Sequence, residues 1–305
     1  MSEESEVLWL KLTEIFLPKK QSYPYLPIHL FKCVNYPLVF PNITKITVYL
    51  QKILNFQSFL KMSSEKINPY KEKEAPKTEQ VAEMFDNISG KYDFLNHFFS
   101  LGIDKIWRNK VRNIVKNIPN SQILDVATGT GDLAIALSKI PGTNIIGVDI
   151  SNKMLEVGRQ KVLRKKLEGR VDLRNGDSLR LPFDENQFDL VTVAFGVRNF
   201  ENIRQGLSEI SRVLKPNGKI IVLEFSNPRK FPIKQLFNFY SRKLMPSVGK
   251  LVSKDSRAYS YLPESVQAFP TEDKFAKIIE ESGFEDVTYE NVSGGIAAIH
   301  VATKN

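Results

Sequence analysis

A glycine-rich turn holds the residues whose types and spacing point most directly to chemistry. Gly129, Gly131 and Ala134 fit the pattern G-x-G-x-x-A. A turn of this kind, between a buried strand and a helix, lets the backbone approach a ligand closely. Asp149 ends the next apolar run, where a carboxylate can accept hydrogen bonds from both hydroxyls of a ribose. The pattern therefore predicts a ligand that contains a nucleoside, and taken alone it allows a dinucleotide.

The charge of the turn separates two classes of cofactor. Asp132 opens the helix after the turn, and Asp125 lies just before the turn. A carboxylate at a helix N-terminus repels the pyrophosphate of a dinucleotide. S-adenosylmethionine has no phosphate and carries a sulfonium and an ammonium group. The acidic turn therefore favours S-adenosylmethionine as the cofactor.

Two more side chains follow the next predicted strand. Asp177 lies where a carboxylate can bind the amino group of an adenine, and Ser178 stands beside it. Two structural alternatives remain open. Asp149 could be the N-cap of the helix that follows it, and Asp177 could form an Asx turn before Leu179.

Alternating strands and helices must position these residues. Apolar spacing predicts helices over Thr78 to Phe85 and Phe94 to Asn117. The expected strands are Gln122 to Ala127, Asn144 to Asp149, Arg170 to Asn175, Phe188 to Phe195 and Gly218 to Phe225. The expected helices among and after them are Asp132 to Lys139, Asn152 to Leu167, Arg204 to Leu214 and Glu272 to Ser282. This alternation predicts an α/β fold with a doubly wound, mostly parallel sheet.

The last two apolar runs change the direction of the sheet. Val287 to Val292 and Ile296 to Thr303 are joined only by Ser293 to Gly295. A parallel pair needs a much longer connection, so these runs predict an antiparallel hairpin. A parallel sheet that ends in such a hairpin is the shape of a class I S-adenosylmethionine-dependent methyltransferase.

The composition narrows the range of partners. The 305-residue chain has a formal net charge of +9, 42% hydrophobic residues and 25% charged residues, as in an ordinary soluble protein. It has no dense Lys/Arg block with interleaved aromatic residues, so we expect no nucleic-acid partner. The single cysteine, Cys33, excludes an intrachain disulfide, and three scattered histidines predict no metal site. Such sparse use of cysteine suits a reducing compartment, so we expect a cytoplasmic protein. No apolar run is long enough to span a bilayer.

The N-terminal part of the chain differs from the rest. Residues 1–77 are expected to be a poorly ordered extension and linker, ahead of a methyltransferase domain over 78–305 with an inserted helical cap at about 227–270. Residues 1–61 have two readings: a segment dispensable for activity or a misassigned start, or a membrane-surface anchor with a basic amphipathic helix from Ile43 to Leu60.

From about Thr78 to Lys304 the sequence resembles the UbiE/MenG family of menaquinone/ubiquinone biosynthesis C-methyltransferases. The Phe195 to Asn199 run (Phe-Gly-Val-Arg-Asn) is far more specific to this family than the glycine turn. The stretches that carry the resemblance are Val81 to Asp93, Ile123 to Asp132, Phe195 to Asn199, Leu214 to Ser226 and Tyr259 to Ser265.

The resemblance implies the cofactor contacts of the family. They fall on Thr130, Asp149, Asp177 and Ser178, while a serine that some members use at the end of the fourth strand is Ala194 here. The glycines of the turn, Gly129 and Gly131, are also expected to bind the cofactor. Tyr92, in a helical N-terminal lid, is expected to close over it or simply to pack.

The resemblance also implies the reaction, which is methyl transfer to a ring carbon of a polyprenylated quinol. The most direct substrate is 2-demethylmenaquinol; a benzoquinol of ubiquinone biosynthesis and a soluble small molecule are the alternatives. Arg198 and Asn199 are the expected catalytic residues, with Arg198 stabilising a phenolate and Asn199 orienting it. The structural alternative is an ion pair of Arg198 with Asp86 or Asp93.

A polyprenyl tail must enter from a bilayer. The basic, aromatic segment 229–245 has the composition of an interfacial helix, or of a helical cap packed on the domain. We therefore expect transient contact with a membrane surface, peripheral on the inner face of the cell membrane. The oligomeric state is not readable from the sequence.

Overall fold

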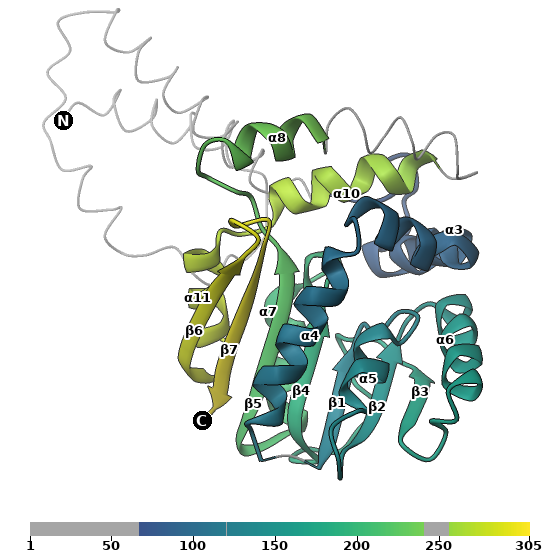
Figure 1. Ribbon diagram of the computed structural model, residues 1–305, viewed down its shortest axis with the longest axis vertical. Helices are drawn as coiled ribbons and strands as arrows, with labels where there is room; N and C mark the ends of the chain where they lie inside the picture. The colour runs from purple at the N-terminus through teal and green to yellow at the C-terminus, as the bar shows by residue number, and fades with distance from the viewer. Residues whose placement is uncertain (1–66, 120, 241–255) are drawn as a thin grey trace, which may run out of the picture. The chain divides into compact units, whose positions relative to one another are not determined.

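A seven-stranded sheet with the order β3-β2-β1-β4-β5-β7-β6 is the framework of the protein (Figure 1). The computed structural model describes residues 67–119, 121–240 and 256–305. They belong to a compact unit that spans Lys66–Asn305. The strands are β1 (Gln122–Val126), β2 (Asn144–Asp149), β3 (Val171–Asn175), β4 (Phe188–Ala194), β5 (Leu214–Phe225), β6 (Phe284–Val292) and β7 (Ala297–Lys304).

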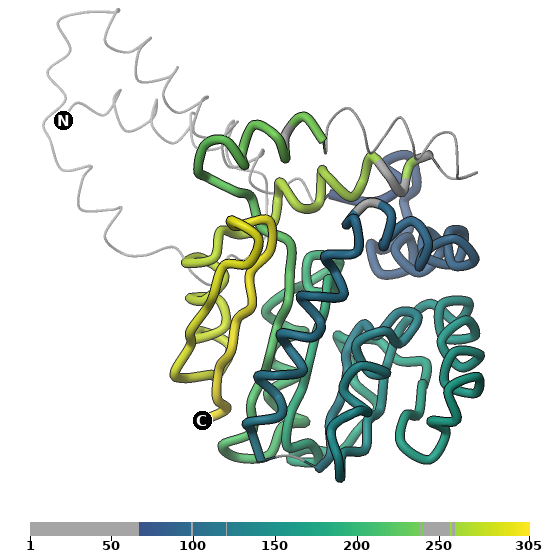
Figure 2. Tube along the Cα trace, viewed as in Figure 1, coloured from purple at the N-terminus to yellow at the C-terminus, as the bar shows by residue number. Residues whose placement is uncertain are grey.

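Strand direction follows the expected scheme. Strands β1 to β5 pair in parallel, and β7 pairs antiparallel with both β5 and β6. The hairpin lies beside β5 in the Cα trace, in yellow next to green (Figure 2). The predicted antiparallel ending of the sheet, and with it the class I fold, is confirmed.

Helices cover both faces of the sheet because its strands are apolar on both sides. One hydrophobic cluster joins the sheet to α4, α5 and α6, and the other joins it to α7 and α11. The helices of the described residues are α3 (Lys77–Phe99), α4 (Ile103–Lys116), α5 (Asp132–Leu137), α6 (Asn152–Arg164), the 3-10 helix η2 (Val197–Asn199), α7 (Ile203–Val213), α8 (Ile233–Phe239), α10 (Ser256–Ala268) and α11 (Glu272–Glu280).

The N-terminal helices differ from the prediction. The sequence predicted a break in the helix between Phe85 and Phe94, but α3 continues through this stretch. The chain leaves the helical conformation later, between α3 and α4. Leu101 and Gly102 have φ values of 50° and 76°, a left-handed conformation that cannot continue a right-handed helix. The prediction was wrong because apolar spacing runs through this corner without a change of period.

Three helices lie near the carboxyl ends of the parallel strands. Figure 1 shows α8 and α10 above this edge of the sheet, with α3 beside them. No helix in the described ranges is long and apolar enough to cross a membrane. The segments 1–66 and 241–255, which include the helix expected from Ile43 to Leu60, lie outside the described residues.

Candidate functional site

A cavity lies at the carboxyl ends of β1, β2, β3 and β4, under helix α3. The structure brings most of the predicted cofactor residues together in its lining, from strand ends that are far apart in the sequence. Those in the lining are Tyr92, Gly129, Thr130, Asp149, Asp177 and Ser178, together with Ala194. Gly131 is the one predicted cofactor residue outside this lining.

The glycines shape the turn after β1. Gly129 and Gly131 have φ values of +57° and +76°, which glycine adopts without the steric cost of a side chain. A Cβ on Gly131 would also stand 3.2 Å from Leu173 Cδ1. The role of Gly131 is therefore to form the turn, while Gly129 exposes its backbone to the cavity.

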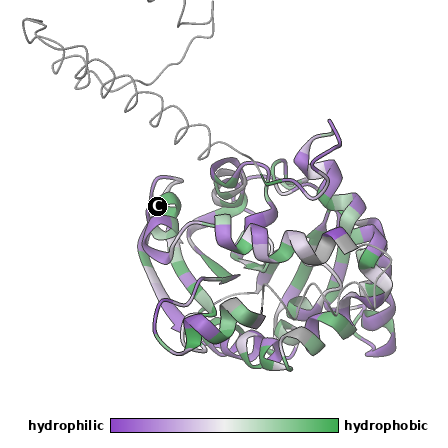
Figure 3. Ribbon diagram, turned by 90° about the horizontal axis from the view of Figure 1, so that it is seen from above, coloured by the Kyte–Doolittle hydropathy of each residue, from purple (hydrophilic) through white to green (hydrophobic). Residues whose placement is uncertain are grey.

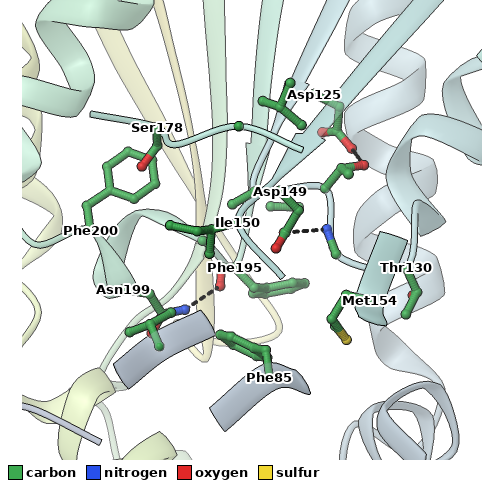
Figure 4. Close-up of a pocket in the computed structure, with 18 of the residues that line it drawn as sticks. Phe85, Asp125, Thr130, Asp149, Ile150, Met154, Ser178, Phe195, Asn199 and Phe200 are labelled. Carbon is green, nitrogen blue, oxygen red and sulfur yellow. Dashed lines mark hydrogen bonds between the residues drawn. The ribbon is translucent and has the colours of Figure 1, made fainter. Parts of the chain in front are cut away.

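Asp149 is fixed by backbone groups at the end of β2. Its Oδ2 accepts a hydrogen bond from Gly129 N at 2.8 Å, and its Oδ1 accepts one from Ser151 N at 2.9 Å. Burial raises the pKa of this carboxyl to about 6. The helix N-cap is Ser151, whose Oγ accepts from Met154 N. The N-cap alternative for Asp149 is therefore wrong, and the carboxylate lines the cavity (Figure 4).

Asp177 and Ser178 reach the cavity from the loop after β3. The Asx turn that the sequence left open is present, because Leu179 N donates to Asp177 Oδ1 at 2.9 Å. The turn does not remove Asp177 from the cavity lining. Figure 4 shows Ser178 and Phe200 on one side of the cavity and Met154 on the other.

The acidic turn is more balanced in charge than its sequence indicates. Asp132 pairs with Lys161 and lies 3.6 Å from Arg108 Nη2. Asp125 is buried and accepts hydrogen bonds from two threonine hydroxyls, at 2.6 and 2.7 Å; burial raises its pKa to about 6. Within the described residues, Asp149 and Asp177 form no ion pair, so these two carboxylates, rather than the turn, offer negative charge to a cationic cofactor.

Helix α3 closes the cavity from above and is attached at several points along its length. Asp93 accepts hydrogen bonds from Thr130 Oγ1 at 2.5 Å and from Lys161 Nζ at 2.8 Å. Asp86 accepts from Ser151 Oγ at 2.5 Å. The Thr130 hydroxyl donates to Asp93 and also accepts a hydrogen bond from Lys161 Nζ at 3.0 Å. A cofactor contact at this residue would therefore fall on its backbone or on the remaining lone pair of the hydroxyl oxygen.

A second, larger cavity of about 660 Å³ adjoins the first. Its walls come from α3, α4, α8, α10, η2 and the end of β5, and they are mostly apolar. Trp107, Phe195 and Phe225 form an aromatic cluster in it, with ring centroids 4.5 to 6.1 Å apart. The residues that line both cavities are Phe85, Tyr92, Phe195 and Asn199.

The two predicted catalytic residues lie where these cavities meet. Arg198 lines the second cavity and pairs with Glu224 at 2.7 Å, with both side chains buried. The alternative pairing with Asp86 or Asp93 is wrong. Arg198 Nε is buried and has no hydrogen-bond partner within the described residues. Asn199 lines both cavities, and its Oδ1 accepts from Tyr261 OH at 3.2 Å.

Two further residues hold these groups, and the sequence predicted neither contact. Glu224 is a carboxylate directly after the apolar run Ile220 to Leu223 in β5, a pattern that signals a buried charge with a partner. Tyr261 lies inside one of the family-specific stretches, but only the fold shows that it reaches Asn199. Burial raises the pKa of Tyr261, and also that of Tyr92, to about 12, so both phenols remain protonated.

No group of His, Cys, Asp and Glu that could hold a metal ion occurs among the residues that the structure covers. The donor set of the first cavity fits S-adenosylmethionine. It combines the carboxylates of Asp149 and Asp177, which have no cationic partner among the described residues, with a glycine turn open to a ligand and apolar side chains such as Ile150 and Met154.

The fold is shared with solved structures. The [4+2]-cyclase SpnF aligns with a TM-score of 0.56 over 75% of this chain and 97% of its own, at 17% identity. A SAM-dependent methyltransferase from Thermotoga maritima aligns with a TM-score of 0.54 over 74% of this chain and 100% of its own, at 16% identity. At this level of identity the likeness concerns the fold alone.

Sequence relatives are much closer. A demethylmenaquinone methyltransferase from Bacteroides fragilis is 47% identical over 241 residues, which cover 79% of this chain and 98% of the relative. One from Porphyromonas gingivalis is 45% identical over 79% of this chain and 99% of the relative. The ubiquinone/menaquinone biosynthesis C-methyltransferase UbiE of Geotalea daltonii is 43% identical over 75% and 97%. The model of the ubiE/COQ5 methyltransferase family matches residues 73–304, and this chain therefore belongs to that family.

Proposed function

We propose that the enzyme transfers the methyl group of S-adenosylmethionine to a ring carbon of a polyprenylated quinol, specifically of 2-demethylmenaquinol. The observation that carries the proposal is the junction of two unlike cavities. A cavity whose lining includes the carboxylates of Asp149 and Asp177 meets an apolar cavity of about 660 Å³ at Tyr92, Phe195 and Asn199. The names of the relatives from Bacteroides and Porphyromonas support the same substrate.

Four groups would hold the cofactor in the first cavity. Asp149 would accept hydrogen bonds from the two ribose hydroxyls. Asp177, with Ser178 beside it, would accept one from the adenine amino group. The backbone of Gly129 would lie against the remaining part of S-adenosylmethionine. When bound, S-adenosylmethionine supplies a methyl carbon made electrophilic by its sulfonium.

Arg198 would activate the quinol. A ring carbon is a good nucleophile only when an adjacent hydroxyl is ionised or nearly so. The guanidinium is held by Glu224, and the residue lines the apolar cavity. A donor fixed in this way stabilises a phenolate oxygen without reorganising. Asn199, itself oriented by Tyr261, would fix the second polar contact of the ring.

The aromatic cluster would align the ring. Trp107, Phe195 and Phe225 offer flat apolar surfaces next to Arg198, and alignment of the two reactants removes part of the entropic barrier. Methylation replaces the hydrogen of the ring carbon, which leaves as a proton. The tail would occupy the rest of the apolar cavity.

The quinol is a membrane lipid, so the enzyme would act as a cytoplasmic protein in transient contact with a membrane surface. The described part of the expected interfacial segment supports this contact, because Phe231, Leu236 and Phe239 are exposed. Residues 241–245 of that segment lie outside the described residues.

A benzoquinol of ubiquinone biosynthesis is a second candidate acceptor. The relative from Geotalea carries both quinones in its name. A soluble small molecule fits less well, because it would leave a large apolar cavity in contact with water.

Quinone analysis of a deletion strain by mass spectrometry tests the proposal. We expect demethylmenaquinone to accumulate, and the wild-type gene to restore menaquinone. A normal quinone profile would contradict the proposed function. Purified enzyme with S-adenosylmethionine and either quinol then distinguishes the two acceptors, since only the true acceptor gains one methyl group at a substantial rate.

A further inference from the structure

The corner between α3 and α4 carries large apolar side chains that the protein core does not use. Leu101 is 82% exposed, Ile106 65% and Phe94 62%, and Phe98 is also exposed. The rings of Phe94 and Phe98 stack with centroids 6.0 Å apart. Apolar residues grouped in this way on a soluble protein commonly mark a surface of interaction.

The corner adjoins the entrance of the apolar cavity. Leu101, from the corner, and Leu236, from α8, both line this cavity although both are largely exposed to solvent. The cavity therefore reaches the surface between the corner and α8. Seen from above, the helices on this side carry apolar (green) segments among polar ones (Figure 3).

Exposed cations flank both sides of the entrance. Lys105 precedes Ile106 on α4, and Lys230 and Lys234 lie at the start of α8. The stretch 229–240 contains no acidic residue. Apolar side chains flanked by lysines match the interface of an anionic bilayer, where acyl chains lie beneath negative headgroups.

We propose that the α3–α4 corner, defined by Phe94, Phe98, Leu101 and Ile106, enters an anionic bilayer together with α8, so that a polyprenyl tail passes from lipid into the cavity between Leu101 and Leu236. The proposal rests on the proposed function for the nature of the tail. It extends the contact surface to a part of the chain whose composition gave no sign of it.

The occupant is a bilayer rather than a protein because the cavity behind the surface is large, about 660 Å³, and mostly apolar. A protein partner that covered the corner would close the entrance at Leu101 and Leu236. A lipid surface leaves the path of a tail continuous from bilayer to cavity.

Vesicle binding by the full-length chain tests the proposal. The double variant Phe94→Gln/Ile106→Gln changes two corner residues that line neither cavity. We expect about 10- to 100-fold weaker binding to phosphatidylcholine vesicles with 30% phosphatidylglycerol. The matched control is Leu163→Gln on α6, another exposed apolar residue (56%), which should bind as the wild type does.

Turnover separates this proposal from the proposed function. On a tail-less demethylated naphthoquinol in lipid-free solution the double variant should equal the wild type, and on vesicle-embedded demethylmenaquinol it should lose activity in parallel with binding. Unchanged vesicle binding would overturn the bilayer surface. So would a wild-type dimer that dissociates in the double variant, because the corner would then be covered by a second copy. No turnover of the wild type on either quinol would instead refute the proposed function.

Discussion

Asp149 must serve two roles with one carboxylate. It closes the glycine turn through Gly129 N and fixes Ser151 N, and it faces the cofactor cavity. Each oxygen accepts one backbone hydrogen bond and retains capacity for a second. A buried group with this geometry is suited to bind a pair of vicinal hydroxyls.

The variant Asp149→Ala should lose S-adenosylmethionine binding by about 100-fold or more. Two charge-assisted hydrogen bonds would be lost, each worth about 1.5–3 kcal/mol. Isothermal titration calorimetry measures the change, with Asp172→Ala on the exposed part of β3 as the control. Equal affinity of the Asp149 variant and the wild type would place the ribose elsewhere.

Cofactor affinity should depend on pH through the same carboxyl. Its pKa of about 6 lies above the ordinary aspartate value, because burial disfavours the charged form. As pH falls from 7.5 to 5 the group is protonated, and the affinity should fall about tenfold. Calorimetry across this range should show a flat and weak profile for Asp149→Asn. Asp125 also has a pKa of about 6, so Asp125→Asn should retain the pH dependence if Asp149 causes it.

The same two carboxyls should make the cofactor-free enzyme more stable as pH falls, whereas cofactor affinity decreases. An acid whose pKa is raised in the folded state binds protons more tightly there than in the unfolded chain. The contribution of Asp125 and Asp149 to the free energy of unfolding is therefore most favourable below about pH 4, and declines as pH rises towards 6.

Removing only one partner of the Arg198–Glu224 pair should lower the free energy of unfolding more than replacing both. Glu224→Ala would leave the guanidinium buried without its counter-ion, and should lower the free energy of unfolding by about 3–5 kcal/mol. The double variant Glu224→Leu/Arg198→Met should restore most of this loss, yet have no activity. Urea unfolding and turnover measure the two effects. Full turnover of the stable double variant would contradict the role of Arg198.

At the scale of elements, α3 both covers the proposed cofactor site and restricts access to it. The cavity beneath it measures about 90 Å³, whereas ligand sites are commonly 300–1,000 Å³. We therefore expect the helix to move outward when a cofactor binds. Its attachment through Asp93 to Lys161 and Thr130 connects this movement to the glycine turn.

Lys161→Met should loosen the lid. The lysine side chain is only 12% exposed and pairs with Asp93 on α3 and Asp132 on the turn, so its loss should weaken closure by about 1–3 kcal/mol. Hydrogen exchange of amides in α3 should accelerate, and cofactor release should be faster. The exposed pair of Arg174 with Asp172 offers the control Arg174→Met. Unchanged exchange in α3 would show that this ion pair does not hold the lid.

At the scale of the whole molecule, Lys66–Asn305 contains the complete sheet and both cavities. The relative from Bacteroides is covered over 98% of its length by 79% of this chain. A shortened chain that begins at Lys66 should therefore fold and methylate a tail-less quinol at the wild-type rate. Thermal unfolding and turnover test this, and loss of folding would show that residues 1–65 belong to the domain.

The sequence determined the order of the elements, the cofactor class and the family. These features are local: apolar periodicity, left-handed glycines in a turn and short specific runs such as Phe195 to Asn199 can be read without knowing which segments meet. The antiparallel hairpin at the end of the sheet could also be predicted, because a connection of three residues is too short to join parallel strands. By contrast, the corner at Leu101 was missed, because no change of period marks it.

Only the tertiary structure decided the partners of the charged groups and the shape of the sites. Arg198 pairs with Glu224, 26 positions away, and Asp132 is balanced by Lys161 and Arg108. Such pairs depend on which strand ends lie side by side in the sheet. The apolar cavity likewise exists only because α3, α4, α8 and α10 converge on one edge, and a sequence does not encode the space between elements in any local pattern.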